Sequence, residues 1–203
     1  MAVREILLYP KDEELLRLIS KPVEGVTKDV RRLIRDLKDT LLQRPGVGLS
    51  APQIGVHKRV AIIRLGQTHD GEDEELSDPV ALINPEILTT EGEIKDYDGC
   101  LSVPNFYGYT YRPEKIRLST LNVEGKRYEM ALSGLDARVA LHEIDHLNGI
   151  LFIDLIRSRD DLYIIVRDSK RKQNVLVPVD KAFDLSSGVD SWRTISKNNS
   201  LFG

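Results

Sequence analysis

Two segments of the chain have apolar residues at the spacing of an amphipathic helix. In the first, Thr27–Gln43, the apolar positions share one helical face: Val30, Leu33, Ile34, Leu37 and Leu41. Thr27 can cap the amino end, Asp29 favours the positive pole of the helix dipole, and Pro45 ends the pattern. We therefore expect an N-terminal helix that packs on a core.

The second helical segment runs from Ser133 to Asn148. Ser133 is a candidate N-cap with Asp136 three residues further on, and Asn148 followed by Gly149 is typical of a helix end. One face of this helix begins with Leu135, Val139 and His142.

Between the two helices, β-branched runs predict strands at 56–64, 80–83, around Ile94 and at 115–123. Turns are expected at Pro85, Gly92 and Gly125, and the acidic stretch 69–79 is typical of a solvated loop. Beyond Asp154 the chain is first basic, then weakly strand-like at 174–179, then polar.

Composition narrows the class of protein. A chain of 203 residues has room for one ordinary domain, and 41% apolar with 30% charged residues suits a well-solvated surface. The net charge of −3 gives no sign of a nucleic-acid or membrane partner. No apolar run is long enough to span a bilayer, and the start of the chain lacks a signal-peptide pattern. We expect a cytoplasmic protein, and its one cysteine excludes an intramolecular disulfide.

The residues best suited to chemistry lie in the second helix, in the sequence HEIDH at 142–146. Residues four apart lie on the same helical face, so that His142 and His146 can bind one ion. Glu143 can then act as general base on a water whose pKa the ion lowers. The structural alternative is a pair of helix histidines beside a surface glutamate.

A catalytic site of this kind needs a third protein ligand. Phe152 stands where the third histidine of HExxHxxGxxH would be, which excludes that arrangement. Cys100 offers a thiolate in a turn after Gly99, where backbone N–H groups can point at a bound oxygen. The other candidate donors are His57, His69, Asp154, Asp160, Asp161 and Asp168.

A loop rich in glycine, GVGLSAPQIG at 46–55, allows close approach of its backbone to another group. Gln53 is the side chain there whose amide can donate to a developing oxyanion. An ordinary structural turn explains the same composition.

Taken together, three stretches resemble the peptide deformylase family: GVGLSAPQIG at 46–55, DGCLSVP at 98–104 and HEIDHLNG at 142–149. The likeness covers roughly residues 3 to 156. It implies an α+β fold, with antiparallel strands packed around a central HExxH helix and a second, N-terminal helix. Residues 1–156 would form the catalytic metallohydrolase domain, and residues 157–203 a C-terminal extension packed on it.

The resemblance also implies an activity: hydrolysis of the N-formyl group from formyl-methionine at the N-terminus of nascent polypeptides, with release of formate. The ligands would be Cys100, His142 and His146, with a fourth position left open. Glu143 would move the proton. Gln53 and the backbone N–H of Leu101 would hold the oxyanion.

For the substrate, the family implies that backbone near Gly48 and Gly99 pairs with the peptide as an added strand. The methionine side chain would enter a pocket formed by Val47, Leu135, Val139 and the ring of His142. The basic segment 157–172 is a candidate contact with the ribosome, although a solvated charged face explains it as well. No membrane partner and no specific nucleic-acid site is expected.

Coordination chemistry alone names zinc first for one thiolate and two imidazoles. The resemblance points instead to Fe2+ as the native ion, with Zn2+ or Ni2+ able to occupy the same place.

The sequence departs from the commonest family pattern at four positions. Ser50 replaces alanine and can add a hydrogen bond beside Gln53. Arg112 matches a family arginine that can pair with the acid at position 98. Asp98 replaces the usual glutamate and is one methylene shorter, so this salt link must be rebuilt or bridged by water. Leu141 replaces glutamine, and Arg138 stands where some members have an apolar pocket residue and can redirect substrate choice.

Three other interpretations fit part of the sequence. The first is a zincin-type peptidase with an aspartate as third ligand. The second is a cysteine hydrolase in which Cys100 is the nucleophile. The third is a non-catalytic domain with a structural zinc; such sites use four protein ligands, whereas three good ones are found here and Glu143 would have no task.

Overall fold

Two antiparallel sheets and a few helices make up the computed structural model, which describes residues 2–66, 77–168 and 173–182. The helices are α1 (Glu13–Leu16), α2 (Lys28–Leu41), α3 (Gly134–Leu147) and α4 (Val179–Ala182), with 3-10 turns at Ala51–Ile54, Phe152–Leu155 and Arg159–Asp161. The strands are β1 (Gly48–Ser50), β2 (Val60–Ile63), β3 (Val80–Glu91), β4 (Ile94–Cys100), β5 (Val103–Arg112), β6 (Lys115–Leu121), β7 (Arg127–Ser133), β8 (Leu162–Asp168) and β9 (Gln173–Pro178). The expected α+β class is confirmed.

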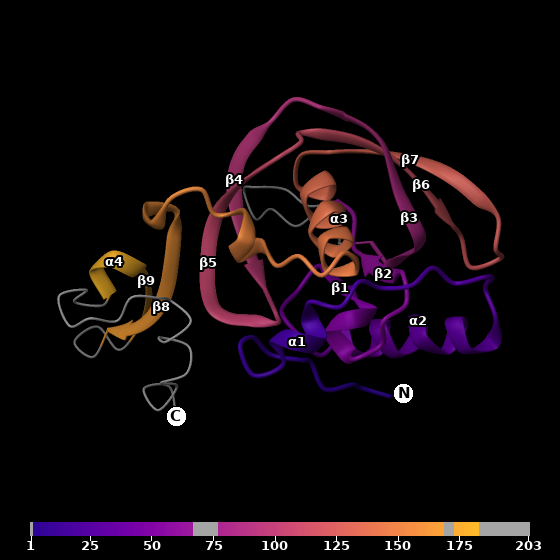
Figure 1. Cartoon of the computed structure of the whole chain (residues 1–203), viewed down its shortest axis with the longest axis horizontal. Coiled ribbons are helices and arrows are strands. Elements are labelled where there is room, and N and C mark those ends of the chain that lie inside the picture. The colour runs from indigo at the N-terminus through magenta and orange to yellow at the C-terminus, as the bar shows by residue number, and fades with distance from the viewer. Residues whose placement is uncertain (1, 67–76, 169–172, 183–203) are drawn as a thin grey trace.

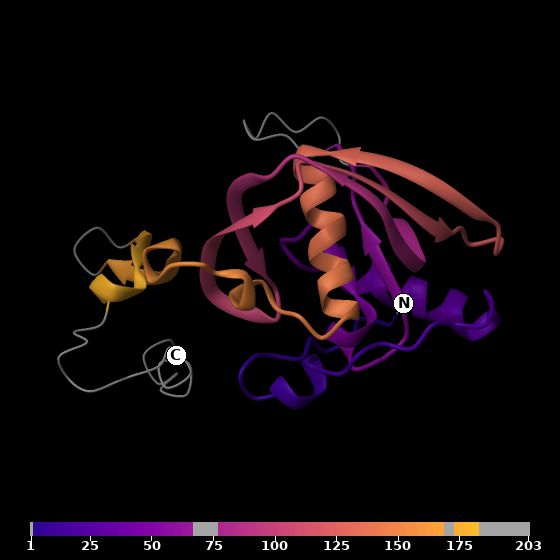
Figure 2. The ribbon, with the colours of Figure 1, turned by 45° about the horizontal axis from the view of Figure 1, so that its top comes forward.

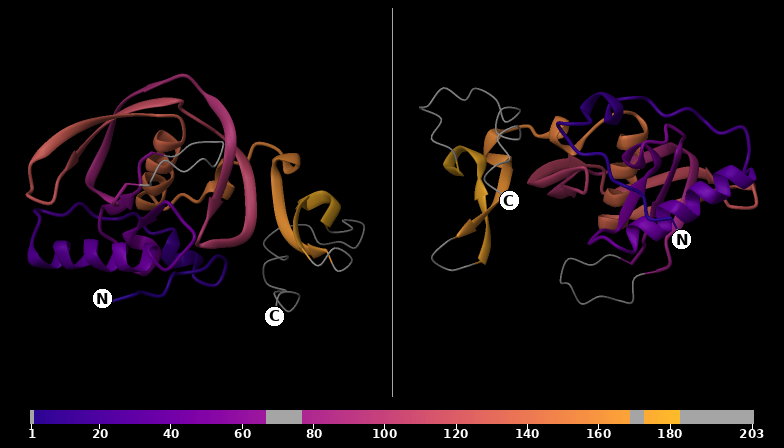
Figure 3. Two further views of the ribbon diagram at one scale, coloured as in Figure 1. Left: turned by 180° about the vertical axis from the view of Figure 1, so that it is seen from behind. Right: turned by 90° about the horizontal axis from the view of Figure 1, so that it is seen from below.

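The first sheet has the strand order β1-β2-β3-β6-β7. Its short strand β1 pairs with β2 in the register Gly48↔Ile63, which places the glycine loop beside a fully buried strand. Helix α2 packs on β1 and β2, and Figure 3 shows it along the outside of the molecule.

Helix α2 forms as its sequence predicts. The Thr27 hydroxyl accepts a hydrogen bond from the Val30 N–H at 3.4 Å, and all five apolar positions of the predicted face are buried. Leu37 is fully buried, so this face supplies much of the core on its side of the sheet.

The second sheet has the order β4-β5-β8-β9. Strands β4 and β5 form a long hairpin in which Ile94 pairs with Arg112 and Gly99 with Tyr107. A register shift then follows, and Cys100 pairs with Val103 at the tip. The cysteine therefore sits at the end of a rigid ribbon.

Helix α3 lies between this hairpin and the first sheet, as Figures 1 and 2 show. It packs on β1 and β2 and ends at Leu147, with Asn148 as its C-cap. Gly149 has a φ of 74°, and a Cβ there would overlap the backbone carbonyl of Arg17. Glycine is thus required for this helix end on two grounds.

Beyond α3, the C-terminal part attaches to the hairpin through main-chain pairing. The start of β8 pairs with β5 in the register Phe106↔Ile164 to Gly108↔Leu162. Leu162, Ile164 and Val179 join a core cluster with Phe106 and Phe152. Strands β8 and β9 therefore extend the second sheet beyond residue 156.

Two sequence predictions were wrong in detail. A turn was expected at Pro85, yet β3 runs through it, because Asn84 takes a positive φ of 49° and the pairing with β6 shifts register between Ile83 and Glu86. Ser133 occupies the N-cap of α3 but makes no capping hydrogen bond with its side chain.

Part of the sequence prediction falls on residues that the structure does not describe, and some strands of the structure were not predicted. Most of the acidic stretch 69–79, including His69, lies outside the described residues. Strands β5, β7 and β8 carry no run that the pattern analysis singled out. No helix within the described ranges is long and apolar enough to cross a membrane.

Candidate metal centre

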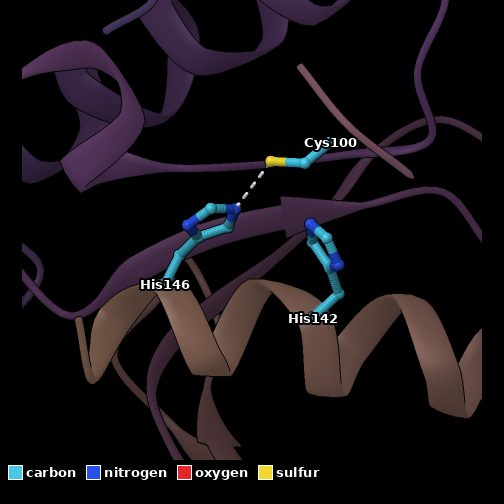
Figure 4. Close-up of side chains that lie close together, drawn as sticks. All are labelled: Cys100, His142 and His146. Carbon is cyan, nitrogen blue, oxygen red and sulfur yellow. Dashed lines mark hydrogen bonds between the residues drawn. The ribbon is translucent and has the colours of Figure 1, made fainter. Parts of the chain in front are cut away.

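Helix α3 and the tip of the β4–β5 hairpin bring three potential ligands together. The rings of His142 and His146 lie one helical turn apart with centroids separated by 5.0 Å. The sulfur of Cys100 lies 3.1 Å from Nε2 of His146, and Figure 4 shows it above the two rings. One ligand atom from each of the three residues lies within 4.8 Å of the others.

The competing third ligands lie elsewhere. Asp154 forms an ion pair with Arg17, and Asp161 forms one with Lys95. Within the part of the chain that the structure describes, Cys100, His142 and His146 are the one group of acidic, histidine and cysteine side chains close enough to hold an ion. One sulfur and two imidazole nitrogens suit Zn2+ or Fe2+ and leave a coordination position open.

Hydrogen-bond donors surround the Cys100 sulfur. The Ser102 N–H lies 3.4 Å from it and the Gln53 Nε2 lies 3.7 Å from it. The sulfur is therefore held in a fixed position at the tip of the hairpin.

Gln53 is held in one orientation by its neighbour Ser50. Its Oε1 accepts hydrogen bonds from the Ser50 N–H at 2.9 Å and from the Ser50 hydroxyl at 2.8 Å. The amide nitrogen must therefore face Cys100 and Ser102. The hydrogen bond expected from the alanine-to-serine difference at position 50 is confirmed.

Glu143 is buried beside β1, with 3% of its surface exposed. Burial raises the pKa of its carboxyl to about 7. Its Oε2 has no hydrogen-bond partner among the described residues. A Cβ on Gly48 would lie 2.5 Å from its Oε1, so that only glycine fits at this point of β1.

A buried carboxylate, Asp98, joins the hairpin to α3. It accepts hydrogen bonds from Arg112 Nε at 2.8 Å, from Arg138 Nη1 at 3.3 Å and from the Thr110 hydroxyl, and it lies 3.6 Å from Nδ1 of His142. The salt link to Arg112 is therefore direct, with no need of a bridging water. Burial opposes ionisation of Asp98, but the nearby His142 ring and the Arg112 charge hold its pKa well below the usual range.

The two histidines of the centre differ in their surroundings. Burial alone would lower the pKa of His142, but the neighbouring Asp98 carboxylate and Cys100 sulfur raise it well above the usual value. Burial and the neighbouring charge of His142 lower the pKa of His146 well below that value. The orientation of His142 is set by the carboxylate behind it, as is common for metal-binding histidines.

Arg138 contributes to the same network. Its side chain lines the cavity, as expected, but its guanidinium donates to the Thr110 hydroxyl at 2.8 Å and to the Ile94 carbonyl at 3.2 Å in addition to Asp98. The charge of Arg138 is therefore paired within the protein, which argues against a role in attracting an anionic substrate.

A cavity of about 560 Å3 opens over the centre. Leu141, which replaces the glutamine of the commonest family pattern, does not line this cavity but packs with the first sheet on the other side of α3. The cavity lining includes most of the site residues that the sequence indicated: Val47, Gly48, Gln53, Gly99, Cys100, Leu101, Leu135, Val139, His142 and Glu143. It also includes Tyr97 and Tyr107, which the sequence analysis missed, although tyrosines at every second position from 107 to 111 are a visible signal.

Comparison with known sequences places this geometry in one family. The sequence profile described as polypeptide deformylase matches residues 3–161. The peptide deformylase of Methylocella silvestris is 44% identical over 157 residues, which cover 77% of this chain and 78% of that protein. The peptide deformylase of Stutzerimonas stutzeri is 42% identical over 159 residues, with coverage of 78% and 89%.

Solved structures agree. A crystal structure of a peptide deformylase from Legionella pneumophila has a TM-score of 0.66 and 41% identity, covering 76% of this chain and 86% of that one. A class I type b peptide deformylase from Acinetobacter baumannii, solved with Met-Ala-Ser bound, has a TM-score of 0.70 and 34% identity, covering 76% of this chain and 99% of that one.

Proposed function

Because this chain belongs to the polypeptide deformylase family, and so removes the N-formyl group from nascent polypeptides, we propose that Cys100, His142, His146 and Glu143 form its catalytic centre. The observation that carries the proposal is the convergence of one sulfur and two imidazoles beside a buried carboxylate at the floor of a cavity.

The three ligands would hold one divalent ion on α3, the helix that lies between the two sheets. Such an ion supplies Lewis acidity, which activates water and polarises the formyl carbonyl. The family is metal-dependent, and we propose Fe2+ as the native ion, because the resemblance on the three motifs points to iron; Zn2+ or Ni2+ fits the same donors.

Glu143 would move the proton. The oxygen of the attacking water would form a bond to the formyl carbon while the water gives a proton to Glu143. Glu143 would then pass this proton to the amine nitrogen as the carbon–nitrogen bond breaks. The products are formate and a free α-amine. A carboxyl with a pKa of about 7 can both accept and return a proton at neutral pH.

The oxyanion of the tetrahedral intermediate would be held by Gln53 Nε2 and the Leu101 N–H. The two hydrogen bonds from Ser50 support this role for Gln53, because they keep its amide nitrogen on the Cys100 side before substrate arrives.

Two glycines would bind the peptide main chain. Gly48 and Gly99 both line the cavity and have no side chain to block an added strand. The methionine side chain would occupy the apolar part of the cavity beside Val47, Leu135, Val139 and the His142 ring. The Met-Ala-Ser complex of the Acinetobacter relative supports a peptide of this kind as occupant.

The organisation of the chain follows from the same proposal. Residues 1–156 hold every proposed ligand and catalytic group, and residues 157–203 would form an extension packed on them, which the pairing of β8 with β5 supports. A cytoplasmic location is proposed because the substrates are nascent chains.

Replacement of Glu143 by glutamine tests the centre directly. We expect Glu143→Gln to lower the rate of formate release from formyl-Met-Ala-Ser by about 100- to 10,000-fold, the usual contribution of a general base, while the bound ion stays. Glu129→Gln, at an exposed ion pair on β7, is the matched control and should keep the wild-type rate. A Glu143→Gln variant within tenfold of wild type would contradict the proposal.

The ligand set and the ion are tested by metal analysis of protein purified without oxygen. We expect about one ion per chain, because three protein ligands with one open position hold a single ion, and mainly iron, because the family resemblance points to that metal. Loss of a residue that only hydrogen-bonds to a metal ligand lowers metal affinity by roughly 10- to 100-fold. His146→Ala removes a ligand itself, and we expect it to lower metal affinity by more than this. His57→Gln, outside the cluster, should bind as wild type does. If the protein purified without oxygen contained only zinc, the proposal of iron as the native ion would be wrong. If His146→Ala bound the metal as tightly as wild type, the proposed ligand set would be wrong.

The pH dependence of the reaction follows from Glu143. Its pKa is raised to about 7, so below that pH it is increasingly protonated and cannot accept a proton from water. We expect kcat/KM for formyl-Met-Ala-Ser to fall toward tenfold per pH unit below pH 7 and to level off above it. Circular dichroism at each pH serves as the folding control. A flat profile down to pH 5.5 in folded protein would exclude Glu143 as the base.

A contact with the ribosome through the basic segment is the second part of the proposal. Arg157 and Arg159 are exposed at its start. In the full chain, we expect Arg157→Glu with Arg159→Glu to lower co-sedimentation with ribosomes severalfold, because like charges repel the RNA phosphates. Arg31→Glu with Arg35→Glu, on the exposed face of α2, is the matched control. Equal losses from both pairs, or no binding by wild type, would contradict this contact.

A further inference from the structure

One face of the second sheet is covered by tyrosines. Tyr97, Tyr107, Tyr109, Tyr111 and Tyr163, called here the tyrosine face, are all half-buried. They share a side of the sheet because Tyr97 pairs with Tyr109 and Tyr107 pairs with both Gly99 and Tyr163. The face therefore runs from the C-terminal hairpin to the edge of the catalytic cavity.

The cavity end of this face differs from the other end. The Lys95 ammonium lies over the rings of Tyr109 and Tyr111, at 5.5 and 5.6 Å, and the Arg157 guanidinium lies 3.9 Å from the Tyr111 centroid. Within the described ranges no such cation covers Tyr97 or Tyr107. These two rings stack on each other at 5.4 Å with an interplanar angle of 10°, and both line the cavity.

Gly99 lies beneath the Tyr107 ring of this stacked pair. A Cβ at Gly99 would lie 2.6 Å from the Tyr107 ring, so the ring covers the glycine backbone where a side chain would otherwise stand. The neighbouring residue Asp98 points to the opposite side of β4, toward His142 and Arg112. The pocket proposed for methionine and the tyrosine pair thus lie on opposite sides of the same strand.

Alternation along a strand decides which substrate residue meets the tyrosines. Successive side chains of an extended peptide point to opposite faces. If the methionine side chain points to the His142 side, as the proposed function requires, the next side chain points to the side of Tyr97 and Tyr107. We propose that Tyr97 and Tyr107 form a subsite for the second residue of the formylated peptide and favour an aromatic side chain there.

Aromatic stacking gives the expected size of this preference. A favourable ring pair accounts for about a 3- to 10-fold difference beyond simple burial. We therefore expect kcat/KM for formyl-Met-Phe-Ser to exceed that for formyl-Met-Ala-Ser by about this factor, with formyl-Met-Leu-Ser in between. In formyl-Met-Ala-Phe the aromatic residue is on the other side of the peptide, and the preference should be lost.

Leucine variants test which rings are responsible. Tyr97→Leu and Tyr107→Leu remove the ring and keep apolar bulk, and the Phe-to-Ala ratio should fall toward one in each. Tyr111→Leu is the matched control, because Tyr111 belongs to the same face but does not line the cavity. This variant should retain the wild-type ratio, whatever its absolute rate.

The outcomes separate this inference from the proposed function. Wild-type hydrolysis of all four peptides at similar rates overturns the subsite and leaves the centre intact. A preference that survives in Tyr97→Leu and Tyr107→Leu, or that Tyr111→Leu also abolishes, overturns the assignment to these two rings. No formate release from any peptide by metal-loaded protein would overturn the proposed function, and the subsite with it.

Discussion

A buried negative charge, that of Asp98, is the constraint on which the geometry of the centre depends. An ionised carboxylate in a protein interior must be paired and hydrogen-bonded, and Asp98 meets this need with two arginines, a threonine hydroxyl and a histidine. Arg112 lies on the hairpin, whereas Arg138 and His142 lie on α3. Asp98 reaches all of these partners only when the hairpin and the helix are correctly placed against each other. The same placement brings Cys100, two residues after Asp98, over the histidines.

Burial serves the chemistry at Glu143 in the opposite way. Asp98 has partners that keep it ionised, whereas Glu143 Oε2 has none among the described side chains and its pKa rises to about 7. Two neighbouring carboxylates are thus held in different states by their surroundings: Asp98 stays ionised, whereas Glu143 changes its protonation near neutral pH, as the proposed role of proton acceptor requires. Gly48 approaches Glu143 so closely that not even a methyl group would fit between them.

Local patterns in the sequence were sufficient for α2, for α3 and for the histidine pair, because these depend on residues three and four apart. They could not select Cys100 as the third proposed ligand, since Cys100 and His146 are separated by 46 residues and meet only through the hairpin register. The family motifs supplied that choice. The strand through Pro85 and the tyrosine face were missed for a similar reason: a register shift and a shared sheet side are properties of pairing between strands.

The chain contains a single cysteine, and that cysteine lies at the centre itself. A thiol-reactive dye therefore has one target in the whole molecule, and an ion held by the sulfur would occupy the electron pair with which the thiolate attacks the dye. In a buffer free of thiols and chelators, the fraction of chains that is labelled quickly would then report how many molecules lack their ion, without a substrate. The protein is thus its own indicator of metal loss.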